Sequence, residues 1–246
     1  MTSLLTKLYR VIIGFIILIA GVTAERTGLI EYLADAYEYP VILGLFIQHL
    51  YIVSVSMAFA TIIGVAAGII LTRRRFRRYA GICMYIIGLG QTIPSLAVLA
   101  LSMSFLGIGT RPAIFALTIY SILPVARNTL AGITAVPAAL IDAGRGMGMP
   151  PLKVLMEIEI PNAMQVILAG FRVALIINIG TAALSYVIGA GGLGDLIFTG
   201  INLMQTEKLL AGAIPVTLLA LVADFLCELL GLILISKGLR LSNQRG

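Results

Sequence analysis

The chain has little charge and no tryptophan. Of its 246 residues, 11% are charged and 60% are hydrophobic, and the mean hydropathy is +1.07. A water-soluble domain of this size and composition would expose large apolar patches and aggregate. The composition therefore excludes a soluble enzyme or binding domain and indicates a protein whose solvent is lipid.

Residue types that carry catalysis or bind metals are also scarce. The chain has one histidine, His49, which we expect at the membrane interface, and two cysteines, Cys83 and Cys227, in separate apolar stretches. Neither cysteine lies in a cluster of His, Asp or Glu with metal-ligand spacing, and the two are far apart in the sequence, so we predict no metal site and no disulfide. No nucleophile motif accompanies the histidine, which argues against an intramembrane protease. We predict no catalytic residues.

Nucleotide-binding motifs are missing as well. No Gly-x4-Gly-Lys-Ser/Thr loop occurs, so we expect no cofactor in this chain. The sequence Gly189-x-Gly191-x-x-Gly194 matches a dinucleotide fingerprint, but it follows an apolar helix instead of a strand. We interpret it either as a simple turn or as part of a gate at the outer end of that helix.

Six apolar stretches are long enough to cross a membrane. A helical span takes roughly 20 mostly apolar residues, because every backbone polar group has to be satisfied within the segment. The stretches are 8–24, 44–72, 79–106, 112–134, 163–188 and 212–237. We therefore predict an all-α polytopic membrane protein with about six transmembrane helices.

Two of these stretches have special features. The third contains Gly90-Gln91-Thr92-Ile93-Pro94 and is expected to bend or break there. The first resembles a signal peptide, since Lys7 and Arg10 precede its apolar residues. We predict a retained helix, because no clear Ala-x-Ala cleavage site follows.

Basic residues indicate the orientation. Residues 73–78 hold five arginines, and basic loops resist translocation, so this run is expected in the cytoplasm with both chain termini. Confined between two spans, the run has no room to follow a nucleic-acid backbone, and we predict no nucleic-acid partner. Its expected neighbour is anionic membrane lipid. On the opposite side, Glu25, Glu31, Asp35 and Glu38 are either simply solvated or a docking edge for an external partner.

A polar interruption at residues 137–161, here called the elbow, is predicted to form a helix–turn–helix. Pro137 suits a first helical turn, glycines at 144, 146 and 148 end that helix, and Pro150-Pro151 starts a second one that stops before Pro161. We expect Leu140, Ile141, Met147 and Met149 to be exposed. They need either a groove on another protein or the ends of the chain's own helices to bury them.

The elbow resembles the cytoplasmic loop by which permease subunits of ATP-binding-cassette (ABC) importers dock on their ATPase. That loop is written Glu-Ala-Ala, Gly, Ile-x-Leu-Pro. In this chain Asp142, Gly144 and Ile160 replace its Glu, second Ala and Leu. The resemblance implies a set of ATPase-coupling residues: Asp142, Ala143, Gly144, Gly148, Leu152, Ile158 and Pro161.

Four further segments, 90–95, 123–129, 145–149 and 191–195, look like the permease subunits of osmoprotectant importers, a family that moves glycine betaine, choline and carnitine. The resemblance implies a type I ABC importer permease in a bacterial inner membrane. It implies a cytoplasmic ATPase dimer that holds ATP and Mg, a second permease subunit, identical or paralogous, and an extracytoplasmic binding protein. The expected organisation is a first helix and periplasmic loop (1–40), a permease core (41–236) and a cytoplasmic tail (237–246).

Polar side chains within the spans suggest two further sets of residues. Neutral groups could line a translocation pathway or simply hydrogen-bond between helices; they are Gln91, Thr92, Ser95, Asn178, Thr181, Ser185 and Tyr186. Deep ionisable groups are expected to pair, because an unpaired charge in lipid is costly. We predict an ion pair of Arg172 with Asp224 or Glu228, which lie one turn apart.

Two alternatives remain at this stage. An importer of the same architecture could carry another small zwitterion or an amino acid. A secondary transporter driven by an ion gradient would also place a broken helix in the membrane, although no long internal repeat supports it.

Overall fold

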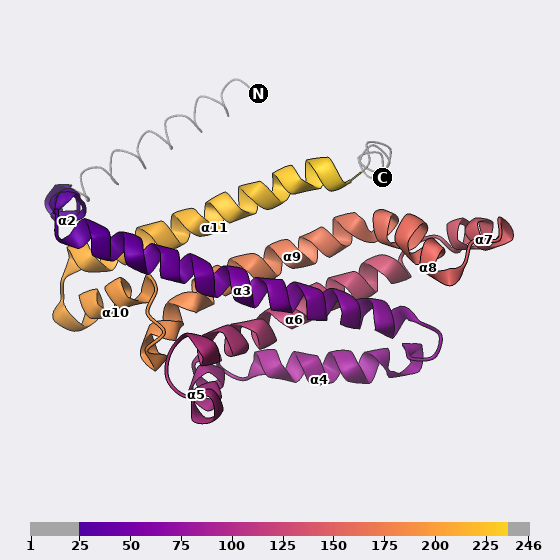
Figure 1. Cartoon of the computed structure of the whole chain (residues 1–246), viewed down its shortest axis with the longest axis horizontal. Helices are drawn as coiled ribbons and strands as arrows, with labels where there is room; N and C mark the ends of the chain where they lie inside the picture. The colour runs from indigo at the N-terminus through magenta and orange to yellow at the C-terminus, as the bar shows by residue number, and fades with distance from the viewer. Residues whose placement is uncertain (1–24, 236–246) are drawn as a thin grey trace, which may run out of the picture.

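In a computed structural model, which describes residues 25–235, the chain is a bundle of long helices that run along one axis (Figure 1). In chain order the elements are α2 (Leu29–Ala34), α3 (Glu38–Thr72), η1 (Arg77–Tyr79), α4 (Ala80–Thr92), α5 (Ser95–Leu106), α6 (Thr110–Thr134), α7 (Ala138–Gly146), α8 (Pro151–Val154), η2 (Leu155–Glu159), α9 (Ile160–Ala182), η3 (Ala183–Ile188), α10 (Gly194–Leu203) and α11 (Thr206–Leu234). The all-α prediction is confirmed for this part of the chain.

Four continuous helices of the described part are long and apolar enough to cross a membrane: Glu38–Thr72, Thr110–Thr134, Pro151–Ile188 and Thr206–Leu234. A further pair, Arg77–Thr92 and Ser95–Leu106, passes the same test together and is bent by 95°. The break falls at Ile93-Pro94, where the sequence predicts it. The stretch at 8–24 and the tail at 237–246 lie outside the described residues.

The prediction for the second short helix of the elbow is wrong in one respect. It does not stop before Pro161, because α8, η2 and α9 form one continuous helical segment from Pro151 onward. η2 is a π-helix, in which Ile160 N–H donates to the carbonyl of Leu155. Pro161 lies in the first turn of α9. Its missing N–H therefore falls where the π-helical turn has already replaced the regular α-helical hydrogen bonds, and the helix can continue.

Helix α6 is central and packs against both α3 and α9. Glycines allow the close approach on both sides. A Cβ on Gly68 would lie 2.5 Å from Thr129 Cβ, and one on Gly170 would lie 2.4 Å from Asn128 Cβ. Gly64 and Gly68 therefore serve packing within the chain, and their four-residue spacing places both on the face of α3 that meets α6.

Replacing Gly68 by valine is expected to destabilise the bundle by about 1–3 kcal/mol, because the added side chain overlaps Thr129 and forces α3 away from α6. Thermal unfolding of the detergent-purified protein measures this. Gly44→Val is the matched control, since Gly44 lies in the same helix and a Cβ added there would have nothing within 4 Å. Equal loss in both variants would contradict the packing role.

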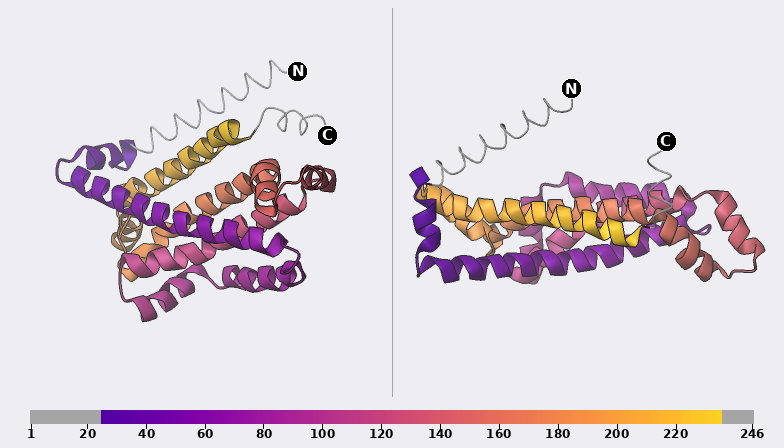
Figure 2. Two further views of the ribbon diagram at one scale, coloured as in Figure 1. Left: turned by 45° about the vertical axis from the view of Figure 1, so that its right-hand side comes forward. Right: turned by 90° about the horizontal axis from the view of Figure 1, so that it is seen from above.

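The two ends of the bundle differ. One end carries α2, α10 and the glycine turn before α10, and the other carries the arginine run and the elbow (Figures 1 and 2). In the view from above, α7 and α8 project beyond the ends of the long helices (Figure 2). The outer part of the elbow thus extends past the ends of the other long helices.

Candidate functional site: the projecting elbow

Close packing at Gly144 holds the elbow in its bent shape. Gly144 is buried, and a Cβ there would lie 2.4 Å from Ile158 Cδ1. The turn is closed by the N–H of Met149, which donates to the Gly144 carbonyl at 3.1 Å. Gly148 follows in the left-handed region at φ 78°, which strongly favours glycine. The structure thus brings together Gly144, Gly148 and Ile158, three of the residues predicted for coupling.

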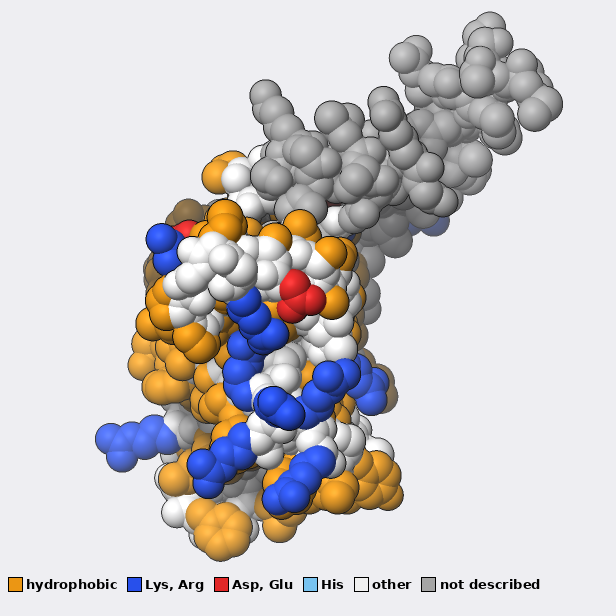
Figure 3. Space-filling model, turned by 90° about the vertical axis from the view of Figure 1, so that its right-hand side faces the viewer, with side chains coloured by type: hydrophobic (Ala, Val, Ile, Leu, Met, Phe, Trp, Pro, Cys, Tyr) orange, Lys and Arg blue, Asp and Glu red, His pale blue; other side chains and the backbone are white. Residues whose placement is uncertain are grey.

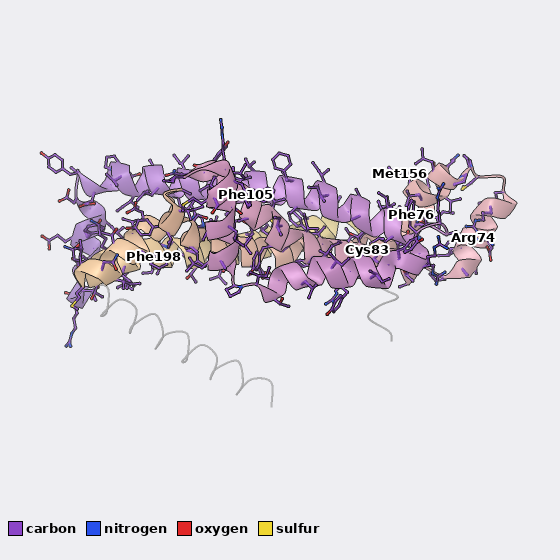
Figure 4. The ribbon with its side chains drawn as sticks, turned by 90° about the horizontal axis from the view of Figure 1, so that it is seen from below. Arg74, Phe76, Cys83, Phe105, Met156 and Phe198 are labelled. Carbon is purple, nitrogen blue, oxygen red and sulfur yellow. The ribbon has the colours of Figure 1, made fainter. Side chains whose placement is uncertain are left out.

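The outer face of the elbow is apolar. Its exposed side chains, with exposed fractions, are Leu140 at 42%, Met147 at 70%, Leu152 at 69% and Met156 at 58%. Met156 is labelled at this end of the molecule in Figure 4. The expectation for Ile141 and Met149 is wrong, since Ile141 packs on the cluster that holds Ile133 and Val136 and Met149 is half-buried. Leu140 and Met147 precede the long helix Pro151–Ile188, and Leu152 and Met156 lie on its first turns.

Charged residues surround this apolar face. Figure 3 looks onto this end of the molecule, where Lys and Arg side chains gather. Asp142 and Arg145 form an exposed pair one turn apart, with 3.8 Å between Oδ1 and Nη1. Ala143 is exposed beside them, and Pro161 is exposed at the start of α9. An exposed apolar patch with a charged rim is the usual anatomy of a protein interface.

One ion pair at the base of the elbow was not predicted. Arg73, directly after α3, pairs with Glu159 at the end of η2, and only 7% of the Glu159 side chain is exposed. The guanidinium also donates to Thr72 Oγ1, at 2.7 Å from Nη2. In the sequence, Arg73 is only one of the five arginines of the basic run. The one sequence signal was Glu159 itself, a carboxylate between two isoleucines.

At the opposite end of the bundle, the glycine turn (residues 189–194) packs against α3. Gln48 donates from Nε2 to the carbonyl of Ala190 at 2.7 Å, and a Cβ on Gly191 would lie 2.5 Å from Gln48 Oε1. His49 is fully buried beside the turn, with Nε2 3.2 Å from the Ile179 carbonyl. The expected interfacial position of His49 is therefore wrong. The burial of His49 depends on the small residues of the turn, which face it on α3.

Short α2 covers this same end. Tyr32 donates from its hydroxyl to Glu38 at 2.8 Å. Burial, together with this carboxylate, raises the pKa of Tyr32 well above its ordinary value. Glu31 and Asp35 line a hollow with these two residues.

The seven residues proposed for a pathway occupy different settings. Asn178 is buried and joins three spans, since it donates to Ser121 Oγ at 2.8 Å and Ser56 donates to its Oδ1 at 3.1 Å. Ser185 is also fully buried, and its hydroxyl has no hydrogen-bond partner among the described residues. The other five are at least partly exposed: Gln91, Thr92, Ser95, Thr181 and Tyr186.

Two of these exposed residues have clear structural partners. Gln91, at the end of α4, donates from Nε2 to the Tyr120 carbonyl of α6 at 2.9 Å. Tyr186 stacks on Phe198 of α10, with ring centroids 5.6 Å apart, and Phe198 is labelled in Figure 4. Both contacts fix irregular segments, the break in one span and the turn after another.

Arg172 of α9 lies against Asp224 of α11. The contact is bidentate, with Nη2 to Oδ2 at 2.5 Å and a second bond from Nε to Oδ1. The side chains keep 39% and 32% of their surface exposed. Glu228, the other candidate partner, is exposed one turn further along.

Replacing Asp224 by asparagine is expected to lower the yield of folded protein severalfold, because Arg172 loses its counter-charge within the membrane. The double exchange Arg172→Asp with Asp224→Arg should restore much of that yield. Size-exclusion chromatography of detergent extracts is the measurement. Glu228→Gln is the matched control, and a loss in that variant as large as in Asp224→Asn would contradict the assignment of Asp224 as the partner.

Comparison with known proteins agrees with the fold. Residues 60–231 match the family model of the binding-protein-dependent transport system inner membrane component. The chain is 44% identical over 199 residues to the carnitine transport permease protein OpuCB of Listeria monocytogenes, covering 81% of this chain and 90% of that one. It is 46% identical over 184 residues to the osmoprotectant import permease protein OsmY of Salmonella typhimurium, covering 75% and 78%.

A solved structure matches the fold. An inward-facing methionine ABC transporter, MetNI, superposes with a TM-score of 0.72 at 20% identity, covering 82% of this chain and 100% of that one. The helices therefore have the arrangement of an ABC importer permease.

The family match and the long apolar helices together define a polytopic transport subunit of the membrane. The chain belongs to the family of binding-protein-dependent transport system inner membrane components.

Proposed function

We propose that this chain is the permease subunit of an ATP-driven importer of small osmoprotectants, solutes of the glycine betaine, choline and carnitine class. The observation that carries the proposal is the apolar outer face of the elbow, which projects beyond the spans in a chain 44% identical to a carnitine transport permease. An external binding protein delivers the solute. ATP and Mg bind to a separate ATPase dimer.

The orientation follows from the charged end. Since the arginine run and the elbow share one end of the bundle, the tendency of basic loops to stay inside places that end in the cytosol. Helix α11 finishes on the same side, which supports a cytosolic location for the end of this helix. A crossing by residues 8–24 would start the chain there as well.

The elbow is the docking element for the ATPase. Met147, Leu152 and Met156 supply exposed apolar contacts for this interface, and methionine is enriched at protein interfaces. Asp142 and Arg145 supply charges at the rim. Closure of the ATPase dimer on ATP would move the elbow, and the elbow would move the spans.

A second permease subunit completes the pathway. Only 17% of the most apolar window of α11 is buried within the chain. An apolar groove of about 600 Å³ runs beside α11 and is lined also by α3 and α9. Lipid or a second subunit covers these surfaces. The partly exposed polar residues that could face a shared pathway are Gln91, Thr92, Ser95, Thr181 and Tyr186.

Selection of the solute resides mainly outside this chain. Quaternary ammonium groups are commonly recognised by aromatic cages, in which tryptophan is the strongest member, and this chain has no tryptophan. The external binding protein therefore supplies the cage. The permease supplies the translocation pathway and transmits the movement of the ATPase to it.

Reconstitution tests this function. The chain, its ATPase and its binding protein are placed in vesicles, and uptake of labelled glycine betaine, choline, carnitine and methionine is compared with and without ATP on the ATPase side. We expect ATP-dependent uptake of the quaternary ammonium solutes only. ATP-dependent uptake of methionine alone would contradict the cargo. Uptake driven by an ion gradient without the ATPase would identify a secondary transporter instead.

A further inference from the structure

We propose that the ion pair between Arg73 and Glu159 is the link that carries movement of the elbow into helix α3. This inference rests on the proposed function, because it assigns a route for the movement that the ATPase imposes. Arg73 and Glu159 are positioning residues, and neither needs to touch the ATPase or the solute. The pair joins segments 86 residues apart in the sequence.

The first step of the route lies within the elbow. Helix α7 has its main packing contacts with α8 and η2. The central contact is the packing of Ile158 against Gly144, where an added Cβ would overlap the Ile158 side chain. A push on α7 therefore reaches η2 directly, and Glu159 is the last residue of η2.

The second step leads from η2 to α3. Glu159 is almost completely buried, and both of its carboxylate oxygens accept hydrogen bonds from Arg73. The Arg73 guanidinium is itself fixed on α3, since Nε donates to the Ile69 carbonyl at 3.3 Å and to Thr72 Oγ1 at 3.0 Å. A planar guanidinium held on two sides transmits position more faithfully than a flexible ammonium group.

The third step spreads the movement through the bundle. Helix α3 lies against α6 along much of its length, with Gly64 and Gly68 in close contact with that helix. At its far end α3 carries Gln48 and His49, which hold the glycine turn and α9. The two ends of α3 thus contact the elbow base and the opposite closure of the bundle.

The π-helical turn gives this junction a physical reason to move. A π turn is a local departure from the α-helical ladder, and such turns are frequent at functional sites. η2 separates α8 from the span α9 within one continuous helix. A change of helical winding at η2 would rotate Glu159 relative to α3, and the ion pair would make α3 follow.

The other arginines of the run differ from Arg73. Arg74, Arg75, Arg77 and Arg78 are exposed, and the Arg78 guanidinium lies 4.6 Å from the centre of the Tyr79 ring. Arg74 is labelled in Figure 4 at this end of the molecule. It is the immediate neighbour of Arg73 and carries the same charge, so it is a matched control.

The experiment compares Arg73→Gln, Arg74→Gln, Glu159→Gln and the double exchange Arg73→Glu with Glu159→Arg in the complete reconstituted complex. The readout is the ratio of ATPase activity with loaded binding protein to basal ATPase activity, together with the amount of ATPase that co-purifies. We expect normal co-purification and a roughly tenfold lower ratio in Arg73→Gln and Glu159→Gln. Arg74→Gln should keep the original ratio, and the double exchange should recover part of it.

Two results would overturn the inference while leaving the proposed function intact. One is an unchanged ratio in both single variants beside normal stimulation of the unaltered complex. The other is loss of assembly in both single variants, because the pair would then serve only the stability of the complex. If the unaltered complex shows no stimulation at all, the proposed function fails, and this inference fails with it.

Discussion

Replacing Leu152 by aspartate is expected to weaken binding of the ATPase roughly 100-fold, because a carboxylate would be buried in the interface without a partner. Leu152 is 69% exposed at the start of α8, so the fold of the chain itself does not need its side chain. A carboxylate at this position would have to lose its water when the ATPase covers it. Binding of detergent-purified permease to immobilised ATPase measures the effect.

Met204→Asp provides the control for this experiment. Met204 is also an exposed apolar residue, at 93%, but it follows α10 at the opposite end of the bundle (Figure 1). We expect this variant to bind the ATPase like the unaltered chain. Equal weakening in both variants would mean that added charge anywhere disturbs the complex, and the elbow would lose its assignment as the docking element.

The second large effect is expected at Gly148. Valine at this position would be forced into the left-handed region at φ 78°, which costs about 1–2 kcal/mol for a residue with a Cβ and more for a branched one. The turn would relax to another conformation and would change the direction of α7 relative to α8. We expect transport to fall about tenfold while the spans remain folded.

A Gly148→Asn variant distinguishes the effect of backbone strain from the effect of side-chain size at this position. Asparagine adopts the left-handed region more readily than other residues with a side chain, and nothing lies within 4 Å of a Cβ on Gly148. Uptake assays should therefore rank the unaltered chain first, Gly148→Asn second and Gly148→Val last. Equal activity of the two variants would show that backbone conformation at this turn does not control coupling.

The spans could be predicted because membrane insertion depends on composition and length. Apolar runs such as 112–134 were located to within a few residues, and Pro94 marked the break between α4 and α5. The start of the fifth span at Pro151 could not be predicted from Pro161. Proline usually ends a helix, whereas here the π-helical turn η2 precedes it and the helix continues.

Contacts of the elbow with the bundle were harder to predict. The spacing of Gly144 and Ile158 suggested one functional loop, and the structure adds that the two residues touch. Arg73 and Glu159 are separated by 86 residues, and nothing local in the sequence distinguishes Arg73 from its four neighbouring arginines. Likewise, the burial of His49 depends on the small residues of a turn at 189–194, which only the folded chain brings to it.

The separation of Arg73 and Glu159 also bears on biogenesis. The ribosome completes the arginine well before it reaches the glutamate, since all of α4, α5, α6 and α7 lies between them. During this interval the guanidinium remains at the membrane surface without the carboxylate that later covers it. A chain that stopped before Glu159 would therefore leave the Arg73 guanidinium without its ion-pair partner.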